Sequence, residues 1–138
     1  MKLRKTMLPV LRPLGGSEEV EALKEVIESG WWGKGPKVAK FEKDFAEMVG
    51  AKYAVAVTSN SHGQDLVMKA LDIRDGDVIN PTISFMATAM IPLWQPNITT
   101  NVVDVDPVTM NMDPEDVRKH VTPNTKAIIV VNEAGVPA

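Results

Sequence analysis

The residues best suited to chemistry follow directly on an apolar run. Residues 53–57 (YAVAV) stop abruptly in Thr58, Ser59, Asn60 and Ser61, and an apolar pattern at helical spacing begins after them. Backbone amides and hydroxyls at such a junction can hold an anion, because the helix dipole adds to their attraction. Ser and Asn are also preferred N-cap residues, so helix capping alone explains the same pattern. The junction therefore predicts either a phosphate site or a capped helix.

A second candidate is a glycine-rich loop with two adjacent tryptophans. Residues 29–36 read SGWWGKGP, and three glycines with one proline in eight residues predict a loop. Tryptophan rarely lies in such a loop without packing or binding, so one interpretation is that Trp31 or Trp32 faces a ligand. The alternative is that one anchors the loop to the core and the other covers a subunit contact. Lys34 is either a contact for an acidic substrate or a solvated lysine.

Phe85 follows a short predicted strand, at the edge of the sheet where a ligand would lie. It either stacks on a flat cofactor or belongs to the core, as aromatics at helix starts usually do. The aspartates at 104, 106 and 113 resemble the start of a calcium loop, but Thr109 stands where that loop requires glycine. With no cysteine and only two histidines, the sequence predicts no metal site, no disulfide and no thiol catalysis.

Composition excludes several other classes of function. The chain has 138 residues, of which 44% are hydrophobic and 24% charged, as in an ordinary globular domain. Its net charge of −3, without a basic cluster, argues against a nucleic-acid partner. There is no signal-peptide pattern and no run of 18 apolar residues, so we expect a soluble, cytoplasmic protein without a membrane partner.

The elements that must position these residues alternate along the chain. Apolar residues at helical spacing predict helices over residues 17–28, 38–50, 61 onward and 85–94, with a short helix after Asp113 and Pro114. The helix over residues 85–94 is expected to bend or stop near Pro92. Strands are predicted at residues 53–57, 78–79, 99–105 and 127–131. This alternation indicates an α/β fold with a largely parallel sheet and flanking helices.

Three details of this arrangement can be specified further. Ser17 is the expected N-cap of the first helix. The run at residues 53–57 is expected to be buried on both faces. In the helix that starts near Ser61, the residues expected to face inward are Leu66, Val67, Ala70 and Leu71.

Taken in order, four blocks of the sequence resemble the N-terminal part of the DegT/DnrJ/EryC1/StrS family. They read SGWWGKGPKVAKFEKDFAEMVGAKYAVAVTSN, NPTISFMATA, VVDVDPVTMNMDP and VTPNTKAIIVVNEAGVPA. The resemblance runs from about Pro13 to Ala138. It implies a pyridoxal 5′-phosphate (PLP)-dependent aminotransferase of polysaccharide biosynthesis, whose substrates are a nucleotide-linked keto-sugar and an amino-acid donor such as glutamate. It also implies the large domain of fold type I, with a mostly parallel, seven-stranded sheet, and a homodimer.

The resemblance assigns roles to individual residues. The small-residue turn that holds the PLP phosphate falls on Ser59, Asn60, Ser61 and His62. Ser61 keeps the hydroxyl of the usual threonine, whereas Asn60 and His62 depart from the commonest residues. Phe85 falls where an aromatic side chain stacks on the pyridine ring. The segment that lines the sugar end of the pocket falls on residues 30–36, with Trp31, Trp32, Gly33 and Lys34 as substrate-binding candidates.

The resemblance also implies that part of the site is missing. The Schiff-base lysine of the family lies downstream of the matched blocks, and none of the lysines at 34, 52, 69, 119 and 126 matches its position. Because PLP chemistry needs that lysine, we expect no catalytic residue and no transamination from this chain. Residues 1–16 are expected to form an extended arm and residues 17–138 an incomplete, truncated domain. The alternatives are a non-catalytic dimerising fragment and a PLP-dependent sugar dehydratase of the same family.

Overall fold

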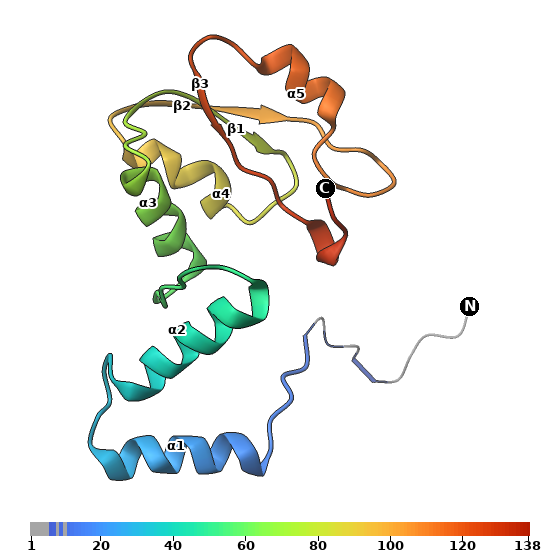
Figure 1. Cartoon of the computed structure of the whole chain (residues 1–138). Coiled ribbons are helices and arrows are strands. Elements are labelled where there is room, and N and C mark those ends of the chain that lie inside the picture. Colours follow the sequence, from blue (N-terminus) through green and yellow to red (C-terminus); the bar gives the residue numbers. More distant parts are fainter. Residues whose placement is uncertain (1–5, 8, 10) are drawn as a thin grey trace. The chain divides into compact units, whose positions relative to one another are not determined.

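The computed structural model describes residues 6, 7, 9 and 11–138, so residues 1–5, 8 and 10 of the predicted arm at residues 1–16 lie outside the described part. The chain divides into two compact units, Met1–Ala56 and Val57–Ala138, which are described separately (Figure 1). The first unit carries two helices. The second carries a sheet with helices, in agreement with the predicted α/β class.

Both helices of the first unit were predicted. Helix α1 (Ser17–Ser29) begins one residue after Gly16, which is its N-cap, so the prediction that Ser17 caps it is wrong. The Glu19 carboxylate accepts a hydrogen bond from the Gly16 amide at 2.6 Å and thereby replaces a capping side chain. Helix α2 (Pro36–Val49) has proline at its start and ends at Gly50, whose positive φ of 70° makes it the expected C-cap.

The apolar faces of these two helices remain largely exposed within their unit. Only Ala46 of α2 is buried. The rings of Phe41 and Phe45 contact each other with centroids 5.8 Å apart, yet both stay partly in solvent. The other exposed apolar residues of the two helices are Val20, Leu23, Ile27, Met48 and Val49. Helices of 13 and 14 residues draw most of their stability from packing of an apolar face, and within this unit these two helices have few such contacts.

The strand predicted at residues 53–57 is not formed. These residues belong to no helix or strand, and Tyr53 and Val55 are exposed, so the expectation that the run is buried on both faces is also wrong. The physical reason is that a strand exists only through hydrogen bonds to a neighbour, and no described strand pairs with this run. Its β-branched composition favours a strand but cannot supply a partner.

The second unit is built on a parallel sheet of three strands. The strands are β1 (Asp75–Pro81), β2 (Asn97–Val103) and β3 (Thr125–Ile128), in the order β2-β1-β3. Parallel neighbours require crossover connections, which the helices between the strands supply. The four residues that end the central strand β1 are buried, as expected for a parallel strand covered on both faces.

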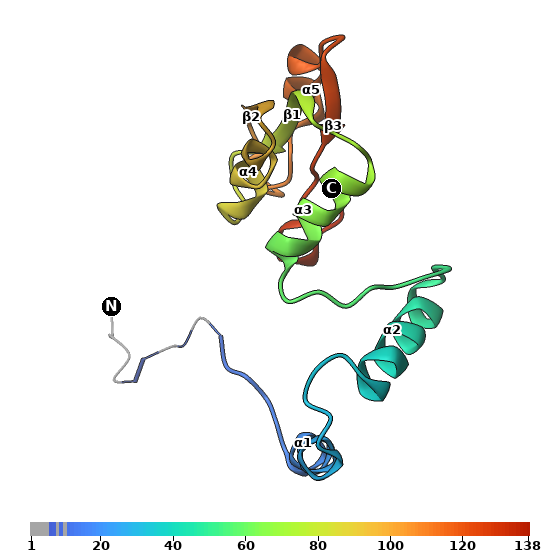
Figure 2. The same ribbon diagram turned by 90° about the vertical axis from the view of Figure 1, so that its left-hand side faces the viewer.

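Helices cover both faces of this sheet. Val78 packs with Met68 of α3 (Asn60–Ala70), whereas its neighbour Ile79 packs with Val117 of α5 (Pro114–His120). Successive side chains of a strand point to opposite faces, so α3 and α5 must lie on opposite sides of the sheet (Figure 2). Asp113 caps α5 by accepting from the Glu115 amide at 2.9 Å, as predicted.

One prediction for the second unit is confirmed and another is wrong. The helix predicted over residues 85–94, with a bend or stop near Pro92, is divided there into α4 (Ala87–Met90) and a 3₁₀ turn (Pro92–Trp94), because Pro92 cannot donate a backbone hydrogen bond. In α3 the inward residue is Met68, while Leu66, Val67, Ala70 and Leu71 are exposed. The apolar stripe of α3 is thus wider than the surface it meets in this chain.

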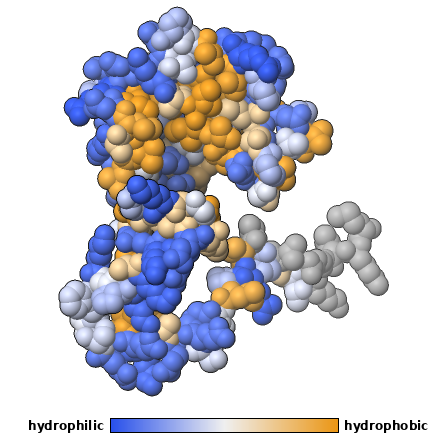
Figure 3. All heavy atoms as spheres, viewed as in Figure 1, coloured by the Kyte–Doolittle hydropathy of each residue, from blue (hydrophilic) through white to orange (hydrophobic). Residues whose placement is uncertain are grey.

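The second unit exposes much apolar surface of its own. Figure 3 shows a broad hydrophobic area on the face of this unit that is turned to the viewer. Large exposed apolar side chains of the unit are Leu66, Leu71, Ile83, Met86, Leu93, Trp94, Ile128 and Val130. Patches of this extent usually mark surfaces that are covered by other protein.

Candidate functional site

The candidate phosphate turn forms the start of α3. Ser59 is in extended conformation, and its Oγ accepts a hydrogen bond from the His62 amide at 3.3 Å. The imidazole Nδ1 of His62 lies 2.9 Å from Ser59 Oγ and 3.0 Å from Thr58 Oγ1. The capping interpretation of this sequence is therefore confirmed. His62 folds back onto two hydroxyls instead of extending past the helix start.

Capping leaves other donors of the turn unused. Among the described residues, the amides of Asn60 and Ser61 donate to no protein group, as is usual for the first turn of a helix. A Cβ added to Gly63 would lie 3.5 Å from Val57 Cγ2, an ordinary van der Waals contact. Two free amides, the Ser61 hydroxyl and the dipole of an 11-residue helix give this turn the donor set that a phosphate group requires.

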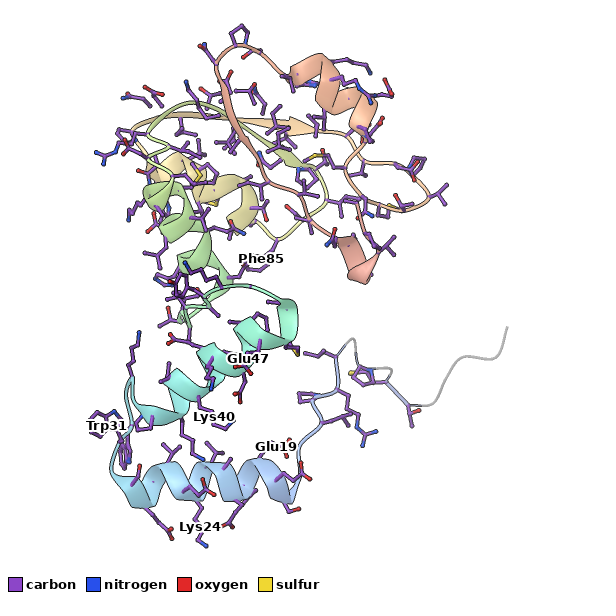
Figure 4. All side chains as sticks on the ribbon, viewed as in Figure 1. Glu19, Lys24, Trp31, Lys40, Glu47 and Phe85 are labelled. Carbon is purple, nitrogen blue, oxygen red and sulfur yellow. The ribbon has the colours of Figure 1, made fainter. Side chains whose placement is uncertain are left out.

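Phe85 lies in the loop after β1 (Figure 4). Its side chain is 77% exposed, so the interpretation that it belongs to the core is wrong for this chain. The loop follows the carboxyl end of the central strand, which is where ligands bind in open α/β sheets. The ring is therefore free to stack on a planar group, and it belongs to the same unit as the turn at Ser59.

The tryptophan loop is held by its own hydrogen bonds. Trp31 Nε1 donates to the Lys34 carbonyl oxygen at 2.8 Å, and the Trp31 amide donates to Ser29 Oγ at 3.1 Å. A Cβ on Gly35 would lie 2.1 Å from Trp31 Cδ1, so this position must be glycine for the indole to keep its place. Trp32 is 76% exposed against 60% for Trp31, and its only hydrogen bond, to Ile27, is 3.5 Å long.

A groove of about 620 Å³ opens beside this loop within the first unit. Both tryptophans line it, together with Val26, Val38 and Pro36. Its volume and apolar lining are typical of small-molecule sites. Figure 4 shows Trp31 at the loop between α1 and α2. Trp31 thus orders its own loop but does not anchor it to a core, since its side chain is largely exposed, and Trp32 is the freer ring.

The lysines around the loop are paired with carboxylates. Lys37 donates to Glu25, which lowers the pKa of that carboxyl group by a hydrogen bond and by charge attraction. Lys40 donates to Asp44, and the bond raises the pKa of the lysine. Lys34 Nζ lies 3.6 Å from Glu42 Oε1. An anionic ligand at this loop would therefore compete with protein carboxylates for the lysines.

The role of Asn111 could not be predicted from the sequence. This side chain is buried, donates to the carbonyl oxygens of Val136 and Pro137 at 3.1 Å each, and accepts from the Glu133 amide at 2.9 Å. It thereby fixes the turn that follows β3, in which Ala134 has a left-handed φ of 50°. A hydrogen-bonding partner 22 residues away leaves no periodic trace in a sequence.

Neither a metal site nor a membrane span emerges from the described residues. Within residues 6, 7, 9 and 11–138, no group of three or more His, Asp or Glu side chains is placed to hold a metal ion. None of the helices formed by these residues is long and apolar enough to cross a bilayer.

The fold and these motifs define a member of a known family. The chain belongs to the DegT/DnrJ/EryC1/StrS aminotransferase family, which matches residues 13–138. It is 44% identical over 133 residues to the spore coat polysaccharide biosynthesis protein SpsC of Bacillus subtilis (strain 168), covering 96% of this chain and 34% of SpsC. The chain thus spans about a third of the length of the relatives that it matches.

Solved structures support the same fold. The chain superposes on 3-amino-5-hydroxybenzoic acid (AHBA) synthase with a TM-score of 0.85 and 36% identity, over 91% of this chain and 33% of the synthase. It superposes on the E. coli GDP-4-keto-6-deoxy-D-mannose-3-dehydratase, solved with bound hydrated PLP, with a TM-score of 0.83 and 30% identity, over 90% and 33% of the two chains. The three parallel strands therefore belong to a fold type I PLP-transferase sheet.

Proposed function

We propose that this chain supplies part of the cofactor and substrate site of a PLP-dependent aminotransferase acting on nucleotide-linked keto-sugars. Ser59, Asn60, Ser61 and His62 would hold the cofactor phosphate, and Phe85 would stack on the pyridine ring. Trp31, Trp32, Gly33 and Lys34 would contact the sugar substrate. The amino donor would be an amino acid such as glutamate.

The observation that carries this proposal is the free donor set at the start of α3. The amides of Asn60 and Ser61 have no protein acceptor among the described residues, while Ser59 is already engaged in capping. The two serines therefore have different roles. Ser59 orders the turn, and Ser61 with the two amides binds the anion. When bound, PLP acts as the electron sink that lets an amino group leave one substrate and join another.

The phosphate part of the proposal predicts protection by ligand. PLP and inorganic phosphate should each raise the melting temperature of the chain, and Ser61→Ala should reduce both shifts. Ser17→Ala is the matched control, because Ser17 stands in the first turn of α1 and has no proposed ligand. Equal shifts in Ser61→Ala and wild type would contradict the role of Ser61. No shift with either ligand in wild type would favour the non-catalytic fragment instead.

A substitution of Phe85 tests stacking on the PLP ring separately from binding of the phosphate group. Phe85→Leu keeps an apolar side chain but removes the aromatic face. It should therefore reduce the shift caused by PLP and leave the shift caused by inorganic phosphate unchanged. Equal loss of both shifts would show that the substitution disturbs the turn at Ser59 and would exclude a separate stacking role.

We also propose that these 138 residues hold PLP without a covalent bond and do not transaminate by themselves. None of their lysines matches the Schiff-base position of the family. Borohydride reduction in the presence of PLP, followed by peptide mass spectrometry, should find no specific PLP–lysine adduct. A stoichiometric adduct at one lysine would overturn this proposal.

A sugar dehydratase is the alternative within the family, because one solved relative is a dehydratase.

Organisation and location are part of the same proposal. Residues 17–138 would form part of one large domain, preceded by an extended arm at residues 1–16. The broad apolar surface of the second unit supports a homodimer as the working form, and use of nucleotide-linked sugars suits the cytoplasm. Sedimentation of the chain at increasing concentration tests association directly, and a monomer throughout would contradict it.

A further inference from the structure

We propose that Glu42 is a positioning residue for the tryptophan loop and for Lys34. The inference rests on the proposed function, because Lys34 and the tryptophans matter only as candidate substrate contacts. Glu42 lies in the middle of α2, outside the glycine-rich loop, and touches no candidate ligand position itself. It acts through the groups that its carboxylate holds.

One oxygen of Glu42 makes two contacts that are far apart in sequence. Glu42 Oε1 accepts a hydrogen bond from the Ala56 amide at 2.9 Å and lies 3.6 Å from Lys34 Nζ. Ala56 belongs to the apolar run at residues 53–57, which forms no strand, so this bond gives its amide an acceptor that no strand neighbour supplies. All three residues belong to the first unit.

Burial distinguishes Glu42 from the other acids of α2. Its side chain is 18% exposed, against 53% for Asp44 and 69% for Glu47, which form i,i+4 pairs on the outer face of the same helix. Exposed pairs of that kind contribute little to stability because water and salt screen them. A shielded carboxylate that accepts from a backbone amide makes a stronger, charge-assisted bond, so the contact with Ala56 fixes Glu42 and the contact with Lys34 follows.

Lys34 connects Glu42 to the Trp31 side chain. Its ammonium pairs with Glu42, while its carbonyl oxygen accepts the indole N–H of Trp31 at 2.8 Å. Because contacts hold Lys34 both at its side-chain ammonium and at its backbone carbonyl oxygen, they restrict the glycine-rich loop. Glu42 thus links three parts of the first unit: helix α2, the glycine-rich loop and the end of the apolar run.

Two substitutions separate the two contacts. Glu42→Gln keeps an oxygen that can accept from the Ala56 amide but removes the charge that attracts Lys34. Glu42→Ala removes both. Glu47→Gln is the control, because it neutralises an acid of the same helix that pairs only with Lys43. The full chain is used, with amide exchange of Ala56 read by NMR and acylation of Lys34 read by peptide mass spectrometry.

The expected pattern differs between the variants. Glu42→Ala should speed exchange of the Ala56 amide about tenfold, as loss of a charge-assisted bond implies. Glu42→Gln should keep most of that protection, yet raise acylation of Lys34 roughly two- to fivefold, in line with loss of an exposed ion pair. Glu47→Gln should change neither. Exchange of the Ala39 amide, which donates to Gly35 in the first turn of α2, is the internal reference for helix stability.

Several results would overturn the inference. Unchanged acylation of Lys34 in Glu42→Gln would show that the carboxylate does not position the lysine. Unchanged exchange at Ala56 in Glu42→Ala would show that the amide bond is absent in solution. Neither readout uses PLP or phosphate, so a failure here is distinct from a failure of ligand protection, which would contradict the proposed function.

Discussion

The two units of this chain use apolar residues in opposite ways. In the second unit, Val78 and Ile79 are fully buried between helices on the two faces of the sheet. In the first unit, Phe41 and Phe45 touch each other but remain partly in solvent, and Ala46 is the only buried residue among those that the structure describes there. The difference is that a parallel strand exists only within a covered sheet, whereas a helix completes its backbone hydrogen bonds alone. The presence of helices or strands therefore does not indicate how much of a unit's apolar surface is buried.

The largest expected effect tests this contrast directly. Ile79→Ala removes a fully buried side chain and should lower the free energy of unfolding by about 2–5 kcal/mol. Phe45→Ala, in the first unit, should cost only about 1 kcal/mol because the ring is 43% exposed. Denaturant titration followed by circular dichroism measures both. Equal costs would mean that Phe45 is covered in solution, for example by association of chains.

Two glycines, one in each unit, extend the comparison of the units to the backbone. Gly76 has a φ of 89°, and an added Cβ would lie 2.5 Å from the Asn124 carbonyl oxygen, a backbone atom that cannot rotate away. Gly30, which ends α1, has a φ of 68° but open space around it. Gly76→Ala should therefore cost at least about 2 kcal/mol, and Gly30→Ala about 1 kcal/mol. The same titration compares them, and a smaller cost at Gly76 would show that the β1–β3 junction relaxes.

A third comparison lies inside the first unit. Gly35→Ala should displace the Trp31 indole and break its bond to Lys34, at a cost of about 0.5–1.5 kcal/mol. Gly33→Ala is the matched control, because nothing lies within 4 Å of its missing Cβ. Tryptophan fluorescence should shift in Gly35→Ala and stay unchanged in Gly33→Ala. An identical spectrum in both variants would contradict the packing of Trp31 over Gly35.

The smallest expected effects concern two acids whose pKa is lowered for different reasons. Hydrogen bonds from the amides of Thr109 and Val108 lower the pKa of Asp106 in the second unit, whereas Lys37 lowers that of Glu25 in the first. Because the folded pKa lies below the unfolded value, each acid stabilises the fold above the unfolded pKa. That stabilisation is lost as the pH falls through the folded pKa.

Salt separates the two causes. At high ionic strength the pKa of Glu25 should rise toward its ordinary value, because salt screens the exposed ion pair. The pKa of Asp106 should hardly move, since its donors are backbone amides and the Thr109 hydroxyl. NMR titration of both carboxyl groups with and without salt measures this, and an equal response would contradict the assigned causes.

Much of the fold could be predicted from local chemistry. Asp113 and Pro114 mark the start of α5, Gly50 marks the end of α2, and the alternation of elements indicates the parallel sheet. The errors lie where the outcome depends on distant residues. Residues 53–57 have strand composition but no partner, and the wide apolar stripe of α3 meets a smaller surface than its pattern implies.

In the candidate site, too, features set by neighbouring residues could be predicted, and contacts between distant residues could not. Capping by Ser59 follows from neighbouring residues. The exposed place of Phe85 does not, because an aromatic residue at a helix start usually belongs to the core. The contacts of Glu42 with Ala56 and of Asn111 with Val136 join residues 14 and 25 positions apart, and no periodicity or motif announces such pairs.

The uncovered run at residues 53–57 has a consequence for handling the protein. Three of its five residues, Tyr53, Val55 and Val57, have high β-propensity, and the run contains no charge and no proline, so it resembles the segments that seed intermolecular strand addition. One edge of β3 is also without a neighbour among the described strands. Concentrated preparations of these 138 residues should therefore be prone to form β-rich aggregates, and a lysine placed at Val55 would act as a gatekeeper against them.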